Sequence, residues 1–207
     1  MNLIRRIIFR LVICPLIVCA SLTTHSAFAV EQEQEAAPWT LAKLMHGLSK
    51  VKKSKATYVE RKYLSILDIP LSSSGTLEYI APDRLEKHTL RPKPEKLSLN
   101  QNKLVVQSGD AGESRTLTLQ EFPSIWAFVE SIRSTLAGDV ETLNRFYKVS
   151  LEGRQKQWQL ILRPTDPQAK NMVNEILIKG SMDQINTIEI REVGGDYSVM
   201  SISRDDS

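Results

Sequence analysis

Short segments that alternate between apolar and polar residues occupy most of this chain and limit the folds open to it. In the first half they are 58–67, 76–80, 84–90, 96–99, 103–107 and 115–119, and near the C-terminus 147–151, 158–162, 174–179, 184–192 and 197–203. Turn-forming residues separate them, among them the runs 72–75 (SSSG), 82–83 (PD) and 194–196 (GGD). Short strands with turns about every eight to twelve residues are typical of an antiparallel sandwich or barrel.

Two segments have the three- and four-residue apolar spacing of a helix instead. The first spans 40–52, with Thr40 as its expected N-cap. The second spans 125–136 and is expected to stop at Gly138, after which Asp139 caps a further short turn. Neither internal repeats nor a change of composition divides the segment 38–207, so we expect one domain there.

The N-terminus predicts export. Arg5, Arg6 and Arg10 precede a short apolar core at 11–22, and Ala27-Phe28-Ala29 has the small-x-small pattern of a cleavage site. We expect residues 1–29 to be a signal peptide cut between Ala29 and Val30, and the protein to reach a bacterial periplasm. An uncleaved membrane anchor is the alternative, although the core is shorter than the ~20 residues of a membrane span. The acidic segment 30–37 is expected to be a flexible tail.

Removing that signal peptide changes the chemistry of the chain. Both cysteines, Cys14 and Cys19, lie within it, so the mature protein has no disulfide and no thiolate. Three of the 27 basic residues are removed with the signal peptide, whereas all 24 acidic residues stay. The mature chain therefore has 24 basic and 24 acidic residues and a net charge of zero. No basic patch with interleaved aromatic residues occurs, so nucleic acid is not an expected partner.

A search for catalytic residues returns little. The sequence has no metal-binding His/Glu spacing, nucleophile elbow or phosphate-binding glycine loop, so we expect no metal, no cofactor and no enzyme activity. An envelope hydrolase stays an alternative, and it would have to use Glu60, Glu78 or His88. A curved sheet covered by apolar helices favours a binding cavity instead. The helix stripe Ile125, Phe128, Val129, Ile132 and Leu136 would face it, with Trp126 beside the stripe at a possible rim.

The order of these elements resembles the LolA-like superfamily of periplasmic lipoprotein carriers. The similar features are the signal peptide, a helix ending in basic residues (41–53), a strand opening at Tyr58, the Gly-x-Leu-x-Tyr-x-x-Pro segment 75–82, and the late strand 158–164 (WQLILRP). Two departures indicate a divergent branch: Ala81 stands where the carriers have an arginine before the proline, and 100–102 (NQN) replaces an Asp-Gly turn.

The resemblance implies an α+β, mainly antiparallel fold, a half-open β-barrel with helices covering a hydrophobic cavity. It implies a carrier that shuttles lipoprotein acyl chains, a lipid, or an acyl or polyene product toward the outer membrane, with inner-membrane export machinery and an outer-membrane acceptor as possible partners. The candidate cargo-binding residues are Tyr58, Leu77, Tyr79, Leu85, Ile125, Trp126, Phe128, Val129, Ile132, Leu136, Trp158 and Leu160. The alternative is a periplasmic regulatory sensor of lipoprotein or envelope stress that binds a membrane-anchored partner.

Overall fold

The computed structural model describes residues 38–109, 113–121 and 123–204, without the side chains of 123–125. These residues belong to one compact unit, Ala37–Ser207. The predicted signal peptide, its cleavage site at Ala29 and Val30, and the predicted tail lie outside the described residues. Among the residues that are described, no helix is both long and apolar enough to cross a membrane.

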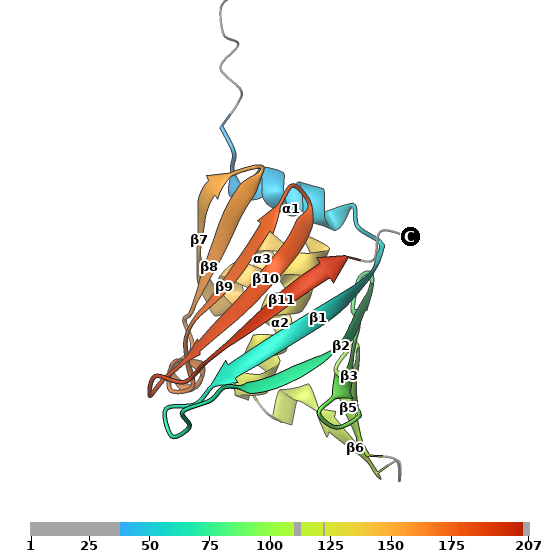
Figure 1. Cartoon of the computed structure of the whole chain (residues 1–207). Helices are drawn as coiled ribbons and strands as arrows, with labels where there is room; N and C mark the ends of the chain where they lie inside the picture. The colour runs from blue at the N-terminus through green and yellow to red at the C-terminus, as the bar shows by residue number, and fades with distance from the viewer. Residues whose placement is uncertain (1–37, 110–112, 122, 205–207) are drawn as a thin grey trace, which may run out of the picture. The chain divides into compact units, whose positions relative to one another are not determined.

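One antiparallel sheet forms most of this unit (Figure 1). Its strands are β1 (Lys53–Tyr63), β2 (Leu71–Ile80), β3 (Arg84–Arg91), β4 (Glu95–Asn100), β5 (Lys103–Ser108), β6 (Glu113–Thr118), β7 (Tyr147–Arg154), β8 (Gln157–Pro164), β9 (Val173–Ser181), β10 (Gln184–Glu192) and β11 (Tyr197–Arg204). Their order is β6-β5-β4-β3-β2-β1-β11-β10-β9-β8-β7. Because β6 and β7 stay at the two edges, the barrel is open.

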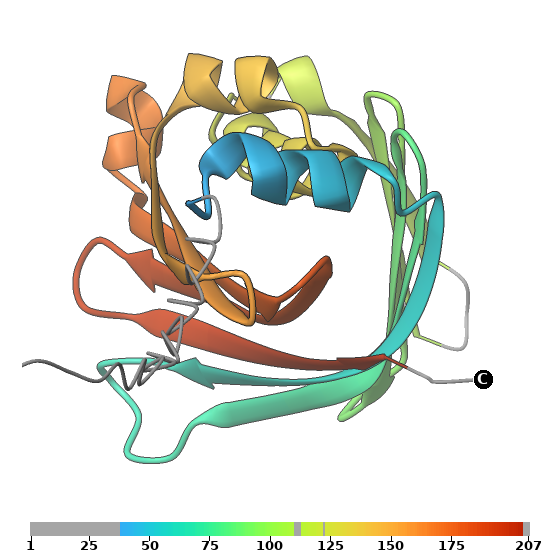
Figure 2. The same ribbon diagram turned by 90° about the horizontal axis from the view of Figure 1, so that it is seen from above.

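Helices occupy the open side of this curved sheet (Figure 2). They are α1 (Leu41–Ser49), α2 (Pro123–Ala137), α3 (Val140–Phe146) and α4 (Pro167–Lys170), with a short 3₁₀ turn, η1, at Leu119–Glu121. Between β6 and β7 the chain leaves the sheet and returns to its far edge through η1, α2 and α3. The α+β fold class and the half-open barrel predicted from sequence are confirmed.

The local signals at the helix ends are also confirmed. The Thr40 hydroxyl accepts a hydrogen bond from the Lys43 amide (3.3 Å) and so caps α1. Gly138 has a φ of 70°, a left-handed conformation that favours glycine after a helix. Asp139 then caps α3 by accepting from the Thr142 amide at 2.9 Å.

The turn predicted at 72–75 is wrong. These residues belong to β2, and the chain turns earlier, between Tyr63 and Leu71. Strand β1 starts correspondingly earlier, at Lys53, and pairs with β2 from Lys62 opposite Leu71 to Lys53 opposite Ile80. Serines and a glycine are poor strand formers alone, but hydrogen bonding to a neighbour on each side overrides this weak local preference.

The packed core lies on only part of the concave face. There α1 and α3 cover strands β7 to β9, and the fully enclosed side chains include Leu44, Met45, Trp158, Leu160 and Ile176. The rest of the concave face is formed by β1 to β5, β10 and β11. Helix side chains do not fill the space over these strands in the same way. The fold therefore combines a solid half with a hollow half.

Candidate functional site

A cavity of about 630 Å³ occupies the hollow half. This volume lies within the range of roughly 300–1,000 Å³ that is usual for small-molecule sites. Its apolar walls are formed by Leu48 and Val51 near α1, by Leu77, Tyr79, Leu85, Leu97, Leu99 and Leu104 on β2 to β5, by Phe128, Val129, Ile132 and Leu136 on α2, and by Ile178, Ile185, Ile188, Ile190, Met200 and Ile202 on β9 to β11.

Strand alternation explains why so many apolar side chains point into this space. Ile188 and Ile190 are two residues apart on β10, and Met200 and Ile202 have the same spacing on β11, so each pair shares a face. Ile188 lies opposite Met200 in the pairing of the two strands. The final hairpin therefore presents one continuous apolar surface to the cavity.

Helix α2 supplies the opposite wall and is fixed by polar contacts away from the cavity. Arg133 donates to the backbone oxygen of Gln101 in the β4–β5 turn (3.3 Å) and forms an ion pair with buried Glu130. The hydroxyl of Tyr147, at the start of β7, donates to the Ala127 oxygen (3.0 Å), and burial raises the pKa of this tyrosine to about 12. These contacts hold Phe128, Val129 and Ile132 over the sheet.

Seven of the twelve candidate cargo-binding residues line the cavity: Leu77, Tyr79, Leu85, Phe128, Val129, Ile132 and Leu136. Whether they contact a cargo stays a prediction. Trp158 and Leu160 are instead enclosed in the packed core, because α1 and α3 cover that part of the sheet. The side chain of Ile125 lies outside what the structure describes.

Trp126 and Tyr58 are also absent from the cavity wall. The Trp126 ring nitrogen donates to Glu130 (3.1 Å), and the ring packs edge-on against Phe146. It thus faces a separate polar hollow between α2 and α3. Tyr58 is buried on the concave side, but the Lys87 ammonium lies over its ring, 4.9 Å from the centroid.

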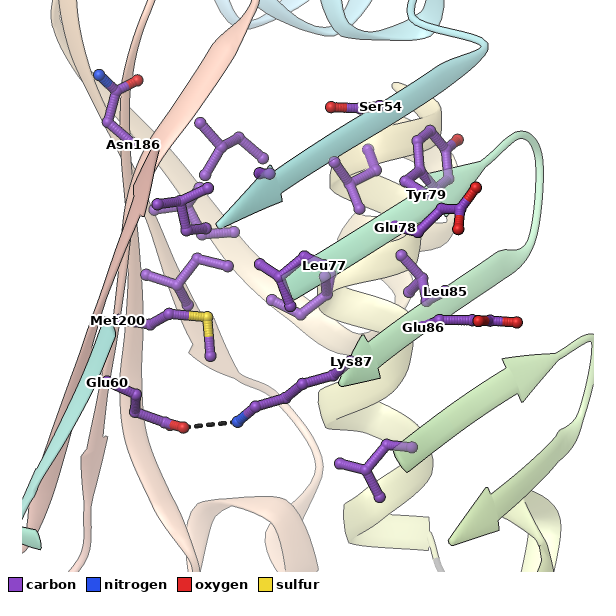
Figure 3. A pocket seen from close by; sticks show the side chains of 18 of the residues that line it. Ser54, Glu60, Leu77, Glu78, Tyr79, Leu85, Glu86, Lys87, Asn186 and Met200 are labelled. Carbon is purple, nitrogen blue, oxygen red and sulfur yellow. Dashed lines mark hydrogen bonds and ion pairs between the residues drawn. The ribbon is translucent and has the colours of Figure 1, made fainter. Parts of the chain in front are cut away.

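An ion pair lies on the wall of this mostly apolar cavity (Figure 3). Lys87 Nζ on β3 donates to Glu60 Oε2 on β1 at 2.6 Å, and both residues line the cavity. The side chains retain 24% and 20% of their exposure, so the pair is accessible from the cavity rather than enclosed in protein. Next to it, the Tyr58 hydroxyl shares a hydrogen bond with Thr89 (2.8 Å).

The three residues of the hydrolase alternative are not brought together. Glu60 and Glu78 both line the cavity, but the Glu78 carboxylate pairs with Lys53 and Lys55 and the Glu60 carboxylate with Lys87. His88 contacts Glu86 at 2.9 Å, on a charged cluster that also includes Arg84 and Lys96. Hydrogen bonds from His88 and Arg84 lower the pKa of Glu86 to about 2.

Two parts of the site were missed from the sequence. The apolar face of the last hairpin has a clear signal, the alternation of Ile188, Ile190, Met200 and Ile202. The Glu60–Lys87 pair has none, because 27 residues separate the partners in the chain. Only the pairing of β1 with β2 and of β2 with β3 brings Glu60 close to Lys87 on the cavity wall.

The described residues thus form an open antiparallel barrel with helices over a mostly apolar cavity. A family model described as outer membrane lipoprotein carrier protein LolA-like matches residues 31–203. The chain belongs to this family, as a divergent member. A comparison with curated proteins found no match.

Solved structures of similar fold have low sequence identity to this chain. LolA superfamily protein NE2245 from Nitrosomonas europaea is 9% identical over 80% of this chain and 92% of that one, with a TM-score of 0.44. A putative outer membrane lipoprotein-sorting protein domain from Vibrio parahaemolyticus is 8% identical over 81% and 94%, with a TM-score of 0.40. LprF from Mycobacterium bovis is 10% identical over 79% and 91%, with a TM-score of 0.36.

Proposed function

We propose that this protein is a periplasmic carrier that encloses the acyl chain of a hydrophobic cargo and shuttles it toward the outer membrane. The cargo is a lipid, an acyl or polyene product, or the acylated end of a lipoprotein. The observation that supports this proposal is the cavity of about 630 Å³ between α2 and the concave sheet, whose walls are mostly aliphatic. Family membership supports the same class of function.

The driving force of such binding is the removal of apolar surface from water. Each methylene group that leaves water gains about 0.8 kcal/mol, so a long acyl chain binds an aliphatic cavity without specific polar contacts. Branched aliphatic side chains such as Ile132, Ile188 and Leu77 offer that environment. Binding is reversible because no covalent step is involved, and release requires a partner surface or membrane that buries the same chain equally well.

The cavity wall divides into a fixed part and a part carried by helices. Strands β1, β2, β10 and β11 are held by continuous hydrogen-bonded pairing. Helix α2 covers the cavity through side chains and is joined to the sheet region by a few polar contacts, such as Arg133 to the Gln101 oxygen. We propose that α2 moves away from the sheet when cargo enters. We further propose that an inner-membrane donor and an outer-membrane acceptor act where α2 covers the cavity.

Native mass spectrometry of protein purified without detergent tests the proposal, together with titration by a fluorescent fatty acid. The proposal predicts a co-purified acylated molecule, or saturable binding at one site per chain. A protein that carries no ligand and also fails to bind fluorescent fatty acids, lysophospholipids and acylated peptides would contradict it.

A further inference from the structure

The Glu60–Lys87 pair joins two strands that are not neighbours. Strand β2 lies between β1 and β3, and Gly75 is the β2 residue opposite both Tyr58 and Thr89. A Cβ at Gly75 would lie 1.8 Å from the His88 oxygen, so a side chain does not fit at this position. Lys87 therefore crosses the sheet above the Tyr58 ring and reaches Glu60 on the cavity surface.

Glu60 and Lys87 neutralise one another on the wall of a mostly apolar cavity. The Ser73 hydroxyl is a further, longer donor to Glu60 at 3.4 Å. A second pair, Lys62 with Glu192 at 2.9 Å, also lines the cavity. Within these two pairs each charge lies next to an opposite one, so together they add no net charge to the cavity wall.

This balance decides which polar groups fit beside it. A ligand with one negative charge would draw Lys87 away and leave Glu60 unpaired, and a ligand with one positive charge would do the reverse. An unpaired charge in a desolvated site is costly. A zwitterionic group avoids that cost, because it replaces one ion pair with two.

We propose that the cargo is an acyl amphiphile with a zwitterionic polar end, whose anionic group binds Lys87 and whose cationic group binds Glu60 while its chain lies along the apolar walls. This inference rests on the proposed carrier function and adds the class of head group.

The test compares three amphiphiles of matched chain length below their critical micelle concentrations: palmitoyl lysophosphatidylethanolamine, palmitate and hexadecylamine. The wild-type protein is expected to bind the zwitterion at least about tenfold more tightly than either singly charged amphiphile. Glu60→Gln is expected to shift the preference toward palmitate, and Lys87→Gln toward hexadecylamine. Glu189→Gln is the control, because Glu189 pairs with Lys179 and Arg191 and does not line the cavity, and it is expected to change none of the three affinities.

The two proposals fail in different ways. If none of the three amphiphiles binds wild-type protein, the head-group inference is overturned, and the carrier function is contradicted as well if acylated peptides also fail to bind. If all three bind with equal affinity, or if palmitate binds most tightly, the acyl cavity stands and the head-group inference is overturned. The double variant E60Q/K87Q removes both charges together, so neither partner is left unpaired, and it guards against a folding defect in the single variants. It is expected to bind all three amphiphiles alike, and a retained preference for the zwitterion would overturn the inference.

Discussion

Gly138, just after α2, packs directly against the backbone oxygen of Met45 in α1. A Cβ at Gly138 would lie 2.2 Å from that oxygen and 2.8 Å from the Ser49 side chain. This contact brings the end of the helix that covers the cavity against the helix that seals the packed core. The helices over the solid and hollow halves of the barrel therefore touch at this backbone contact.

Gly138→Ala is expected to destabilise the protein by about 2 kcal/mol, because it adds a side chain at this contact and at a φ of 70°. Gly109→Ala is the matched control, since Gly109 has a φ of 73° but open space around it. Urea denaturation of both variants separates the contact from the backbone conformation. Equal losses of unfolding free energy would show that the contact with Met45 contributes nothing.

Acid is expected to weaken the fold partly through Glu86. Its pKa in the folded protein is about 2 against an ordinary 4.5, because His88 and Arg84 donate hydrogen bonds to its carboxylate. A lowered folded-state pKa contributes stability above pH 4.5, and that contribution is lost as the pH falls from 4.5 toward 2. Glu86→Gln is expected to cost about 2 kcal/mol at pH 7 and almost nothing at pH 2. A difference in unfolding free energy that is independent of pH would contradict this assignment.

A charge placed on the cavity wall is expected to block binding, whereas the same charge one residue away is not. Leu77 lines the cavity, and Thr76 is exposed on the other face of β2. Leu77→Asp is expected to weaken fatty-acid binding at least about tenfold, because the bound chain would desolvate the carboxylate. Thr76→Asp is the control with unchanged affinity, measured by displacement of a fluorescent fatty acid. Equal effects of both variants would mean that the chain does not lie against β2.

Local periodicity was enough to predict most strands and helices, because strand alternation and helix capping depend on residues that are close together in the sequence. Thr40 and Asp139 cap the helices as expected, and β10 has the predicted bounds, Gln184–Glu192. The run 72–75 was wrongly predicted as a turn because its strand, β2, is stabilised by pairing with β1 and β3. That pairing depends on residues outside the run, so the local sequence does not show it.

The cavity was harder to predict than the fold for a similar reason. Leu77 and Leu160 each belong to an apolar series with a two-residue spacing, Leu77 with Tyr79 and Leu160 with Trp158 and Leu162. Leu160 is enclosed because α1 and α3 pack over β8, whereas Leu77 faces open space below α2. Periodicity tells which face a side chain occupies, but not what covers that face.

Filling the cavity is the most direct test of the central claim. Val129→Trp places a large ring in the space between α2 and the sheet, and Val59→Trp adds the same ring at an exposed position on β1. Titration with a fluorescent fatty acid, with thermal unfolding to confirm that both variants fold, compares them with the wild-type protein. The account predicts saturable binding by wild-type and Val59→Trp proteins and its loss in Val129→Trp. Unchanged binding by Val129→Trp would contradict an acyl-binding cavity beneath α2.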